Sequence, residues 1–252
     1  MYITTQGLVL RVSDYKDHDA LLTLLTREYG RLTVKARGLR RKNSPLIAPC
    51  QLLALAEFTL FEYKGMYTIN EAASIELFQE IRRDLSKLAL GTYFAQVAEV
   101  LSQEDMPSYE LLSLTLNALY ALSKMSLPEN KVKAAFEIRC ACLAGYYPDL
   151  SGCHVCGNEY PDRFDVSAGV LECKNCRNSD SGGLRMPVTP GMLDCLRYLT
   201  SCNARSLLQF HAAPQTIDTL SQLTETYLTT QLERGFSTLD FYKSLLFPMD
   251  SF

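Results

Sequence analysis

Apolar and polar residues alternate with a period of two through roughly the first 75 residues of the chain, the alternation that half-buried strands show. Turn residues interrupt the pattern, notably Glu28-Tyr29-Gly30 and Lys64-Gly65. The pattern predicts strands at residues 5–12, 20–27, 31–37, 52–63 and 66–73. Five short strands are typical of a small, partly open barrel such as the OB-fold.

From Phe78 onwards the apolar spacing changes to three to five residues, as on one face of a helix. Prolines and glycines at the expected ends help to delimit the helices. The pattern predicts helices at about 78–101, 108–125, 129–145, from Thr189-Pro190, and 214–234. We therefore expect an α+β protein with a five-stranded OB-fold barrel at residues 1–77. An α-helical domain at 78–252 should follow, with a Cys-rich segment inserted at about 150–185.

The net charge of −3 hides an uneven distribution. Residues 1–50 hold nine Lys/Arg and four Asp/Glu, whereas residues 51–80 hold one and five. Association with a polyanion depends on this local field rather than on the average over the chain.

No stretch approaches the roughly 18 apolar residues of a membrane span, and the first residues lack the pattern of a secretion signal, so a cytoplasmic location is expected.

Four of the nine cysteines form two Cys-x-x-Cys pairs, Cys153/Cys156 and Cys173/Cys176. This spacing is typical of a zinc ribbon, in which two tight turns each direct two thiolates at one ion. Four thiolates complete a tetrahedral shell and leave no place for substrate, so one structural Zn²⁺ per chain is predicted. We expect His154 to be a bystander. Lys174 and Arg177 are expected to offset the negative charge of the centre, with contact to DNA phosphates as the alternative.

A run of cations begins on the third predicted strand and continues into the loop after it. Five of them fall within eight residues, with Arg31 just upstream on the same strand and Arg11 on the first strand. Such a run is often only a solvated loop, but here it joins strands three and four of a barrel whose fold commonly binds single strands in a positive groove. The predicted DNA-binding residues are Arg11, Arg31, Lys35, Arg37, Arg40, Arg41 and Lys42.

Binding of an unpaired strand also favours aromatic side chains on which bases can stack. The candidates by position are Tyr15, Tyr29, Phe61, Tyr63 and Tyr67. Core or rim packing is the alternative for each, and only one or two are expected to contact DNA.

Several motifs resemble the bacterial RecO family. In the N-terminal part these are Leu8-Val-Leu-Arg11, Tyr15-x-Asp17-x-Asp19, Leu24-Leu-Thr-Arg-Glu-Tyr-Gly30 and Ala36-Arg-Gly38…Arg41-Lys42-Asn-Ser44. In the helical part they are Arg83-Asp84-Leu85, Tyr93…Ala98-Glu99-Val100 and Gly145-Tyr-Tyr-Pro148…Cys153-x-x-Cys156. The similarity covers nearly the whole chain in the family's order. Lys16 and the doubled Arg40-Arg41 depart from the usual pattern without removing its basic character.

The resemblance implies a DNA-repair and recombination mediator without enzymatic activity, which associates with the nucleoid during repair. It implies binding of single- and double-stranded DNA, annealing of complementary strands, partnership with RecR, and capture of the acidic tail of single-stranded-DNA-binding protein (SSB) by the helical domain. An apolar pocket rimmed by cations would suit that tail. Residues of such chemistry are Lys131, Lys133, Phe136 and Arg139, whose spacing also fits an ordinary exposed helix face.

Two other functions remain open at this stage. A nuclease could use carboxylates such as Asp14, Asp17 and Asp19, although the sequence lacks the phosphate-binding loop and the metalloprotease and hydrolase motifs. A zinc-ribbon adaptor that binds only proteins would make the basic run irrelevant to DNA.

Overall fold

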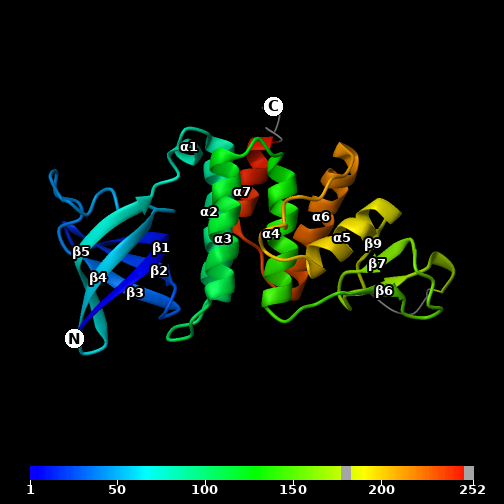
Figure 1. The fold of residues 1–252 in the computed structure, drawn as a ribbon, viewed down its shortest axis with the longest axis horizontal. Coiled ribbons are helices and arrows are strands. Elements are labelled where there is room, and N and C mark those ends of the chain that lie inside the picture. Colours follow the sequence, from blue (N-terminus) through cyan, green and yellow to red (C-terminus); the bar gives the residue numbers. More distant parts are fainter. Residues whose placement is uncertain (177–182, 247–252) are drawn as a thin grey trace. The chain divides into compact units, whose positions relative to one another are not determined.

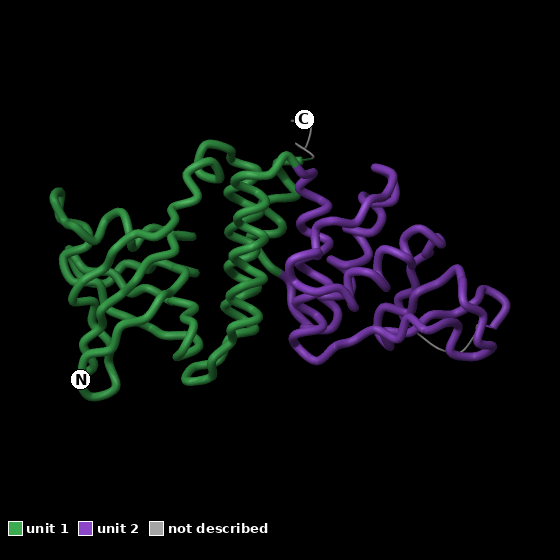
Figure 2. The backbone as a smooth tube through the Cα atoms, viewed as in Figure 1, with its two compact units in different colours: residues 1–126, 236–252 green, residues 127–235 purple. Residues whose placement is uncertain are grey.

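The computed structural model describes residues 1–176 and 183–246, which form two compact units (Figure 2). Unit 1 combines residues 1–126 with the C-terminal segment that starts at Phe236, and unit 2 comprises residues 127–235. The predicted domain boundary between residues 77 and 78 divides the chain differently and stays a prediction. Among the described helices, none has both the length and the apolar character that crossing a membrane requires.

Five strands in unit 1 close into a barrel in the order β1-β2-β3-β5-β4, with β4 pairing back onto β1 (Figure 1). The closing pair, β3 and β5, is parallel and short, and it joins Val34 to Tyr67 and Lys35 to Thr68. This is the OB-fold arrangement. The strands are β1 (Tyr2–Tyr15), β2 (Asp19–Thr26), β3 (Arg31–Ala36), β4 (Leu55–Tyr63) and β5 (Met66–Glu76), so the five predicted strands are confirmed.

The interior of the barrel is filled by alternate residues of these strands. Leu22, Leu24, Val34, Phe58 and Leu60 are all fully buried in one apolar cluster. Burial of each such side chain stabilises the fold by about 1.5–3 kcal/mol. Because side chains alternate along a strand, this inward set fixes which neighbouring residues face outward, including those that form the candidate site.

Helices of unit 1 follow the barrel. The predicted helix at 78–101 is in fact two, because Asp84 interrupts it and caps the second, with its carboxylate accepting hydrogen bonds from the N–H groups of Ser86 and Lys87. The last helix was not predicted from the spacing. This last helix packs on the helix that Asp84 caps. The ring centroids of Phe236, the residue just before the last helix, and of Tyr93 are 5.5 Å apart. These helices are α1 (Gln79–Arg82), α2 (Leu85–Leu101), α3 (Tyr109–Lys124) and α7 (Ser237–Leu246).

In its described residues, unit 2 contains three longer helices and a small four-stranded sheet in the order β6-β8-β7-β9, which belongs to the Cys-rich segment. The predicted insertion of a Cys-rich ribbon among helices is confirmed, although residues 177–182 of it, including Arg177, lie outside the described ranges. The elements are α4 (Glu129–Leu143), β6 (Asp149–Cys153), β7 (Arg163–Asp165), β8 (Val170–Glu172), a 3₁₀ turn (Lys174–Cys176), β9 (Arg185–Pro187), α5 (Pro190–Ser201) and α6 (Pro214–Gln231).

A buried charge cluster joins α4 to α6. The ammonium of Lys133 lies 3.0 Å from a carboxylate oxygen of Glu137 and 2.8 Å from one of Glu225. It also donates to the carbonyl of Ser221, and Thr224 donates to Glu137. Burial raises the pKa of Glu137, and the Lys133 cation opposes that rise. The two helices therefore depend on a cation that neutralises carboxylates inside the unit.

Replacement of Lys133 by Met is expected to destabilise the chain by about 3 kcal/mol at neutral pH, because Glu137 would then be a buried charge without its counterion. The deficit should shrink as the pH falls, since the pKa of Glu137 is raised and a protonated carboxyl needs no cation. Urea unfolding at several pH values measures this, with the exposed-site variant Arg205→Met as control. A deficit that grows on acidification would contradict the explanation.

Candidate nucleic-acid interface and metal centre

The basic segment leaves the barrel at the end of β3. Val34 and Ala36 are buried, so Lys35 and Arg37 project from the outer face of the sheet. Gly38 then adopts a left-handed conformation, with φ of 65°, that turns the chain into the loop. The loop, residues 37–54, continues as a series of turns, in which the N–H of Arg41 donates to the carbonyl of Gly38 at 3.1 Å.

Two of the seven predicted DNA-binding cations are directed toward α2 or the segment after it. Arg11 forms an ion pair with Glu99 at 3.0 Å, and Arg31 donates to the backbone carbonyl of Glu99 at 3.0 Å. Arg31 also lies 3.9 Å from a carboxylate oxygen of Glu104. The structure therefore engages both residues in contacts between the barrel and the helices of unit 1.

The other five cations lie on the outward side of β3 and in the loop after it. Lys35 forms an ion pair with Asp19 at 3.1 Å, and Arg40 pairs with Asp14. The remaining three are exposed and make no ion pair with any residue of the described ranges. These three are Arg37, Arg41 and Lys42, and they give this side of the barrel its uncompensated positive charge.

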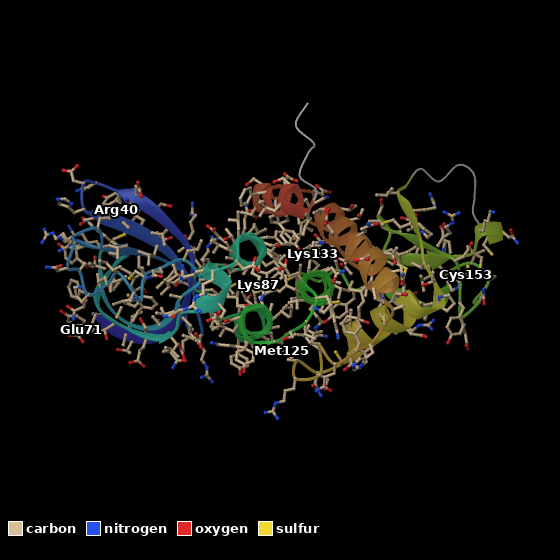
Figure 3. All side chains as sticks on the ribbon, turned by 90° about the horizontal axis from the view of Figure 1, so that it is seen from above. Arg40, Glu71, Lys87, Met125, Lys133 and Cys153 are labelled. Atoms are coloured by element: carbon tan, nitrogen blue, oxygen red, sulfur yellow. The ribbon has the colours of Figure 1, made fainter. Side chains whose placement is uncertain are left out.

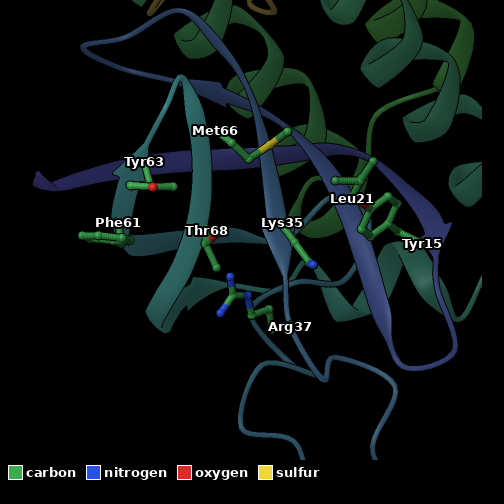
Figure 4. Close-up of a pocket in the computed structure, with 8 residues that line it drawn as sticks. All are labelled: Tyr15, Leu21, Lys35, Arg37, Phe61, Tyr63, Met66 and Thr68. Atoms are coloured by element: carbon green, nitrogen blue, oxygen red, sulfur yellow. The ribbon is translucent and has the colours of Figure 1, made fainter.

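A pocket of about 280 Å³ opens on the barrel beside these cations (Figure 4). In the close-up, Lys35 and Arg37 lie between Tyr15 on one side and the pair Phe61 and Tyr63 on the other. The pocket is lined by Tyr15, Leu21, Lys35, Arg37, Phe61, Tyr63, Met66 and Thr68, which come from β1 to β5 and the start of the loop. Cations and ring faces thus meet in one concave surface.

The predicted aromatic candidates divide into two groups. Phe61 and Tyr63 are exposed and line the pocket, and the half-buried Tyr15 lines it with the Lys35 ammonium 5.0 Å from its ring centroid. Tyr29 and Tyr67 instead pack against the apolar core of the barrel. The ring of Tyr2, which sequence reasoning missed, lies 5.0 Å from that of Phe61 because the two residues pair across β1 and β4.

The four residues predicted to bind a partner are engaged within unit 2. Phe136 is buried, and Lys133, which is labelled in Figure 3, lies in the charge cluster described above. Lys131 is buried with its ammonium 4.7 Å from the ring centroid of Phe210, and Arg139 donates to the carbonyl of Thr200. They do not form an exposed cationic rim, so this geometry does not support their assignment, which stays a prediction.

Two turns of the Cys-rich ribbon bring the four predicted ligands together. The sulfur atoms of Cys153, Cys156, Cys173 and Cys176 all lie within 4.8 Å of one another. A tetrahedral ion with metal–sulfur bonds of about 2.3 Å requires sulfur–sulfur distances of about 3.8 Å, and the Sγ atoms of Cys156 and Cys173 are 3.8 Å apart. The residues therefore fit a four-thiolate metal site.

The electrostatics of the cluster also favour a cation. Burial alone would raise the pKa of Cys153, but the backbone N–H groups of Cys156, Val155 and Cys173 lower it to about 6. Hydrogen bonding with the Cys156 thiol raises the pKa of Cys176 to about 12. The lowered pKa of Cys153 favours its thiolate, whereas the raised pKa of Cys176 favours its protonated thiol. A divalent ion would stabilise all four thiolates together.

His154 lies outside this set of sulfur atoms, as expected of a bystander. Its Nδ1 lies 3.1 Å from the carbonyl oxygen of Leu171, and its Nε2 lies 3.9 Å from a carboxylate oxygen of Glu172. The buried side chain of Arg185 joins the strands of the ribbon by pairing with Glu172 at 2.8 Å and with Asp165 at 3.2 Å.

Carboxylates near the basic loop do not form a comparable centre. Asp14 faces Arg40 and Asp19 faces Lys35. Within residues 1–176 and 183–246, the four cysteines are the one group of three or more His, Cys, Asp or Glu residues close enough to share an ion. The nuclease hypothesis therefore has no preformed metal site at Asp14, Asp17 and Asp19.

Comparisons with known proteins match both parts of the chain. The family model described as "Recombination protein O N terminal" matches residues 1–78, and the one described as "Recombination protein O C terminal" matches residues 82–240.

Three proteins named "DNA repair protein RecO" are similar over most of their length. The protein of Acetivibrio thermocellus is 33% identical over 247 residues, which cover 97% of each chain. That of Alkaliphilus metalliredigens is 27% identical over 97% of this chain and 100% of its own. That of Rubrobacter xylanophilus is 33% identical over 78% of this chain and 80% of its own. With an OB-type barrel, following helices and a four-cysteine ribbon in place, the chain belongs to the RecO family of DNA-repair proteins.

Proposed function

We propose that this chain is a recombination mediator without catalytic activity, which binds single- and double-stranded DNA through the barrel and anneals complementary strands. The observation that carries the proposal is the pocket beside the basic loop, where exposed cations adjoin exposed aromatic rings. Phosphates would be bound by Arg37, Arg41 and Lys42, and unpaired bases would stack on Phe61 and Tyr63. Arg11 and Arg31 are left out of this interface because they contact α2 and Glu104.

Annealing by such a surface needs no reactive group. Two complementary strands repel each other through their phosphates, and a cationic surface lowers that repulsion while it holds the strands together.

In the repair process we propose that the chain acts with RecR, engages the acidic tail of SSB, and thereby helps a recombinase to load on SSB-coated DNA. The family membership supports these partners. The residues predicted for the SSB tail gain no support from the geometry, because Lys131, Lys133 and Phe136 are buried.

For the four-cysteine centre we propose one structural Zn²⁺ per chain. Thiolate ligands in tetrahedral geometry suit zinc, and four of them leave no open position for a substrate. The ion would hold together a ribbon whose strands β7, β8 and β9 are only three residues long each.

The triple variant Arg37→Ala/Arg41→Ala/Lys42→Ala tests the DNA interface. Its affinity for an oligonucleotide is expected to fall, and the log–log salt slope should become shallower by about 0.7 for each phosphate that is no longer neutralised. Annealing of a strand precoated with SSB should slow in parallel. Arg83→Ala is the control, because Arg83 is an exposed cation that pairs with Glu80 on α1. An unchanged affinity and slope in the triple variant would favour a protein-only adaptor.

Removal of the exposed ring, in Tyr63→Ala, is expected to weaken single-strand binding by about 1–3 kcal/mol, the usual contribution of one stacked base. Duplex binding should change little, since paired bases are already stacked. Tyr147→Ala in unit 2 is a matched control, because Tyr147 is 65% exposed and Tyr63 is 62% exposed. Fluorescence anisotropy measures the affinity of each variant for single-stranded DNA and for duplex DNA. Equal weakening for single strand and duplex would rule out stacking at this position.

Replacement of two ligands, in Cys153→Ser/Cys176→Ser, is expected to abolish stoichiometric zinc and to lower the melting temperature of the chain. DNA affinity should persist, because the proposed DNA surface is built from residues of unit 1, whereas the four cysteines belong to unit 2. Elemental analysis and an oligonucleotide titration measure the two properties, with Cys202→Ser outside the cluster as control. Retention of one zinc per chain in the double variant would refute the ligand assignment.

A further inference from the structure

The turn between β1 and β2, residues 16–18, and the residues beside it are bonded to the basic loop at three places. The carboxylate of Asp19, the first residue of β2, accepts a hydrogen bond of 2.8 Å from the N–H of Gly38. The N–H of Arg40 donates to the carbonyl of His18 at 3.1 Å, and the Arg40 side chain pairs with Asp14. The first turn of the basic loop is therefore fixed to the neighbouring hairpin.

Asp19 makes two polar interactions on this side of the barrel. One of its oxygens holds Gly38, and the other lies 3.1 Å from the ammonium of Lys35, which lines the pocket. The hydrogen bond from Gly38 and then the Lys35 cation lower the pKa of Asp19, so the side chain is ionised at neutral pH. A fixed negative charge thus lies among the cations that are proposed to meet phosphate.

Gly38 is the residue through which Asp19 acts on the free cations. It lies directly between Arg37 and the turn that carries Arg41, and its positive φ sets the direction of the loop. The side chain of Arg41 lies against it, since a Cβ built on Gly38 would be 3.3 Å from Cδ of Arg41. A change in the position of Gly38 would move both arginines.

On these observations we propose that Asp19 is a positioning residue for DNA binding: by holding Gly38 it fixes Arg37 at the pocket and Arg41 in the adjoining turn of the loop, and it raises DNA affinity despite its negative charge. This inference rests on the proposed DNA-binding function of the barrel. The proposal predicts weaker DNA binding when the Asp19 side chain is removed. Simple electrostatics predicts the opposite, because removal of an acid beside a phosphate-binding surface ordinarily strengthens binding.

Asp17 provides the matched comparison within the same turn. It is exposed, and it makes no hydrogen bond or ion pair with any residue that the structure describes. Replacement of Asp17 therefore removes the same unit of charge two residues away without releasing the loop.

The experiment measures binding of a single-stranded oligonucleotide by the full chain and by three variants, over a series of salt concentrations. Asp19→Ala should bind more weakly than the unmodified chain at 0.15 M salt, by about fourfold for each phosphate that the displaced arginines no longer neutralise, and with a shallower salt slope. Asp17→Ala should bind as tightly or more tightly. Asp19→Asn should restore binding, because its amide oxygen can still accept from Gly38 while the charge is absent.

The outcomes separate the two proposals. If the unmodified chain ignores oligonucleotides in dilute buffer, the proposed function itself fails. If that chain binds but Asp19→Ala binds as tightly as Asp17→Ala, or Asp19→Asn is as weak as Asp19→Ala, the positioning role is wrong.

If Asp19→Ala does not fold, hydrogen exchange on the unmodified chain decides the question. The Gly38 amide should be protected, because the Asp19 carboxylate accepts its hydrogen bond. Added oligonucleotide should protect it further, because phosphates bound by Arg37 and Arg41 would hold the loop in place. Exchange of the Gly38 amide at the rate of an open loop, with or without DNA, would overturn the proposal.

Discussion

The short parallel pairing of β3 with β5 is the constraint on which the proposed site depends. It closes the barrel by joining Val34 to Tyr67 and Lys35 to Thr68. Without this closure, the basic strand and the β4–β5 hairpin would be separated edges of an open sheet. Once it forms, the outward residues of β3 lie beside those of β5, and the pocket with its cations and rings follows from the alternation of the strands.

The cations near this pocket fall into two groups, those that pair with a carboxylate and those that do not pair with any described residue. Lys35 and Arg40 have carboxylate partners that hold them in place, whereas Arg37, Arg41 and Lys42 are exposed and make no such pair within the described ranges. Under the proposed function, the paired cations would shape the surface, and the exposed ones would supply the field that attracts a phosphate. The negative net charge of the whole chain is therefore no obstacle to a polyanion at this place. The four-cysteine cluster belongs to unit 2, so the role proposed for its ion is confined to the stability of the ribbon.

Much of the fold and of the four-cysteine cluster could be predicted from the sequence because both are encoded by local spacing. Period-two alternation indicated the strands of the barrel, and two Cys-x-x-Cys pairs indicated the four sulfur ligands that the structure brings together. The break at Asp84 was missed because the apolar spacing continues across it, and only the capping hydrogen bonds show where the helix restarts.

Contacts between distant segments could not be predicted in the same way. Arg11 and Arg31 belong to the basic N-terminal part of the chain, but Glu99 on α2 engages both of them. Lys133 has the spacing of an exposed helical cation, yet Glu225 on α6 completes a buried cluster around it. Composition and periodicity contain no information on such partners, because each depends on how separate elements pack.

The most direct test of DNA binding by the barrel is a residue-by-residue map of amide protection when a short single-stranded oligonucleotide is added to the full chain. We predict protection at the end of β3, in the basic loop and in the β4–β5 hairpin, with little change in the four-cysteine ribbon. Protection confined to the ribbon, with none on the barrel, would contradict this interpretation.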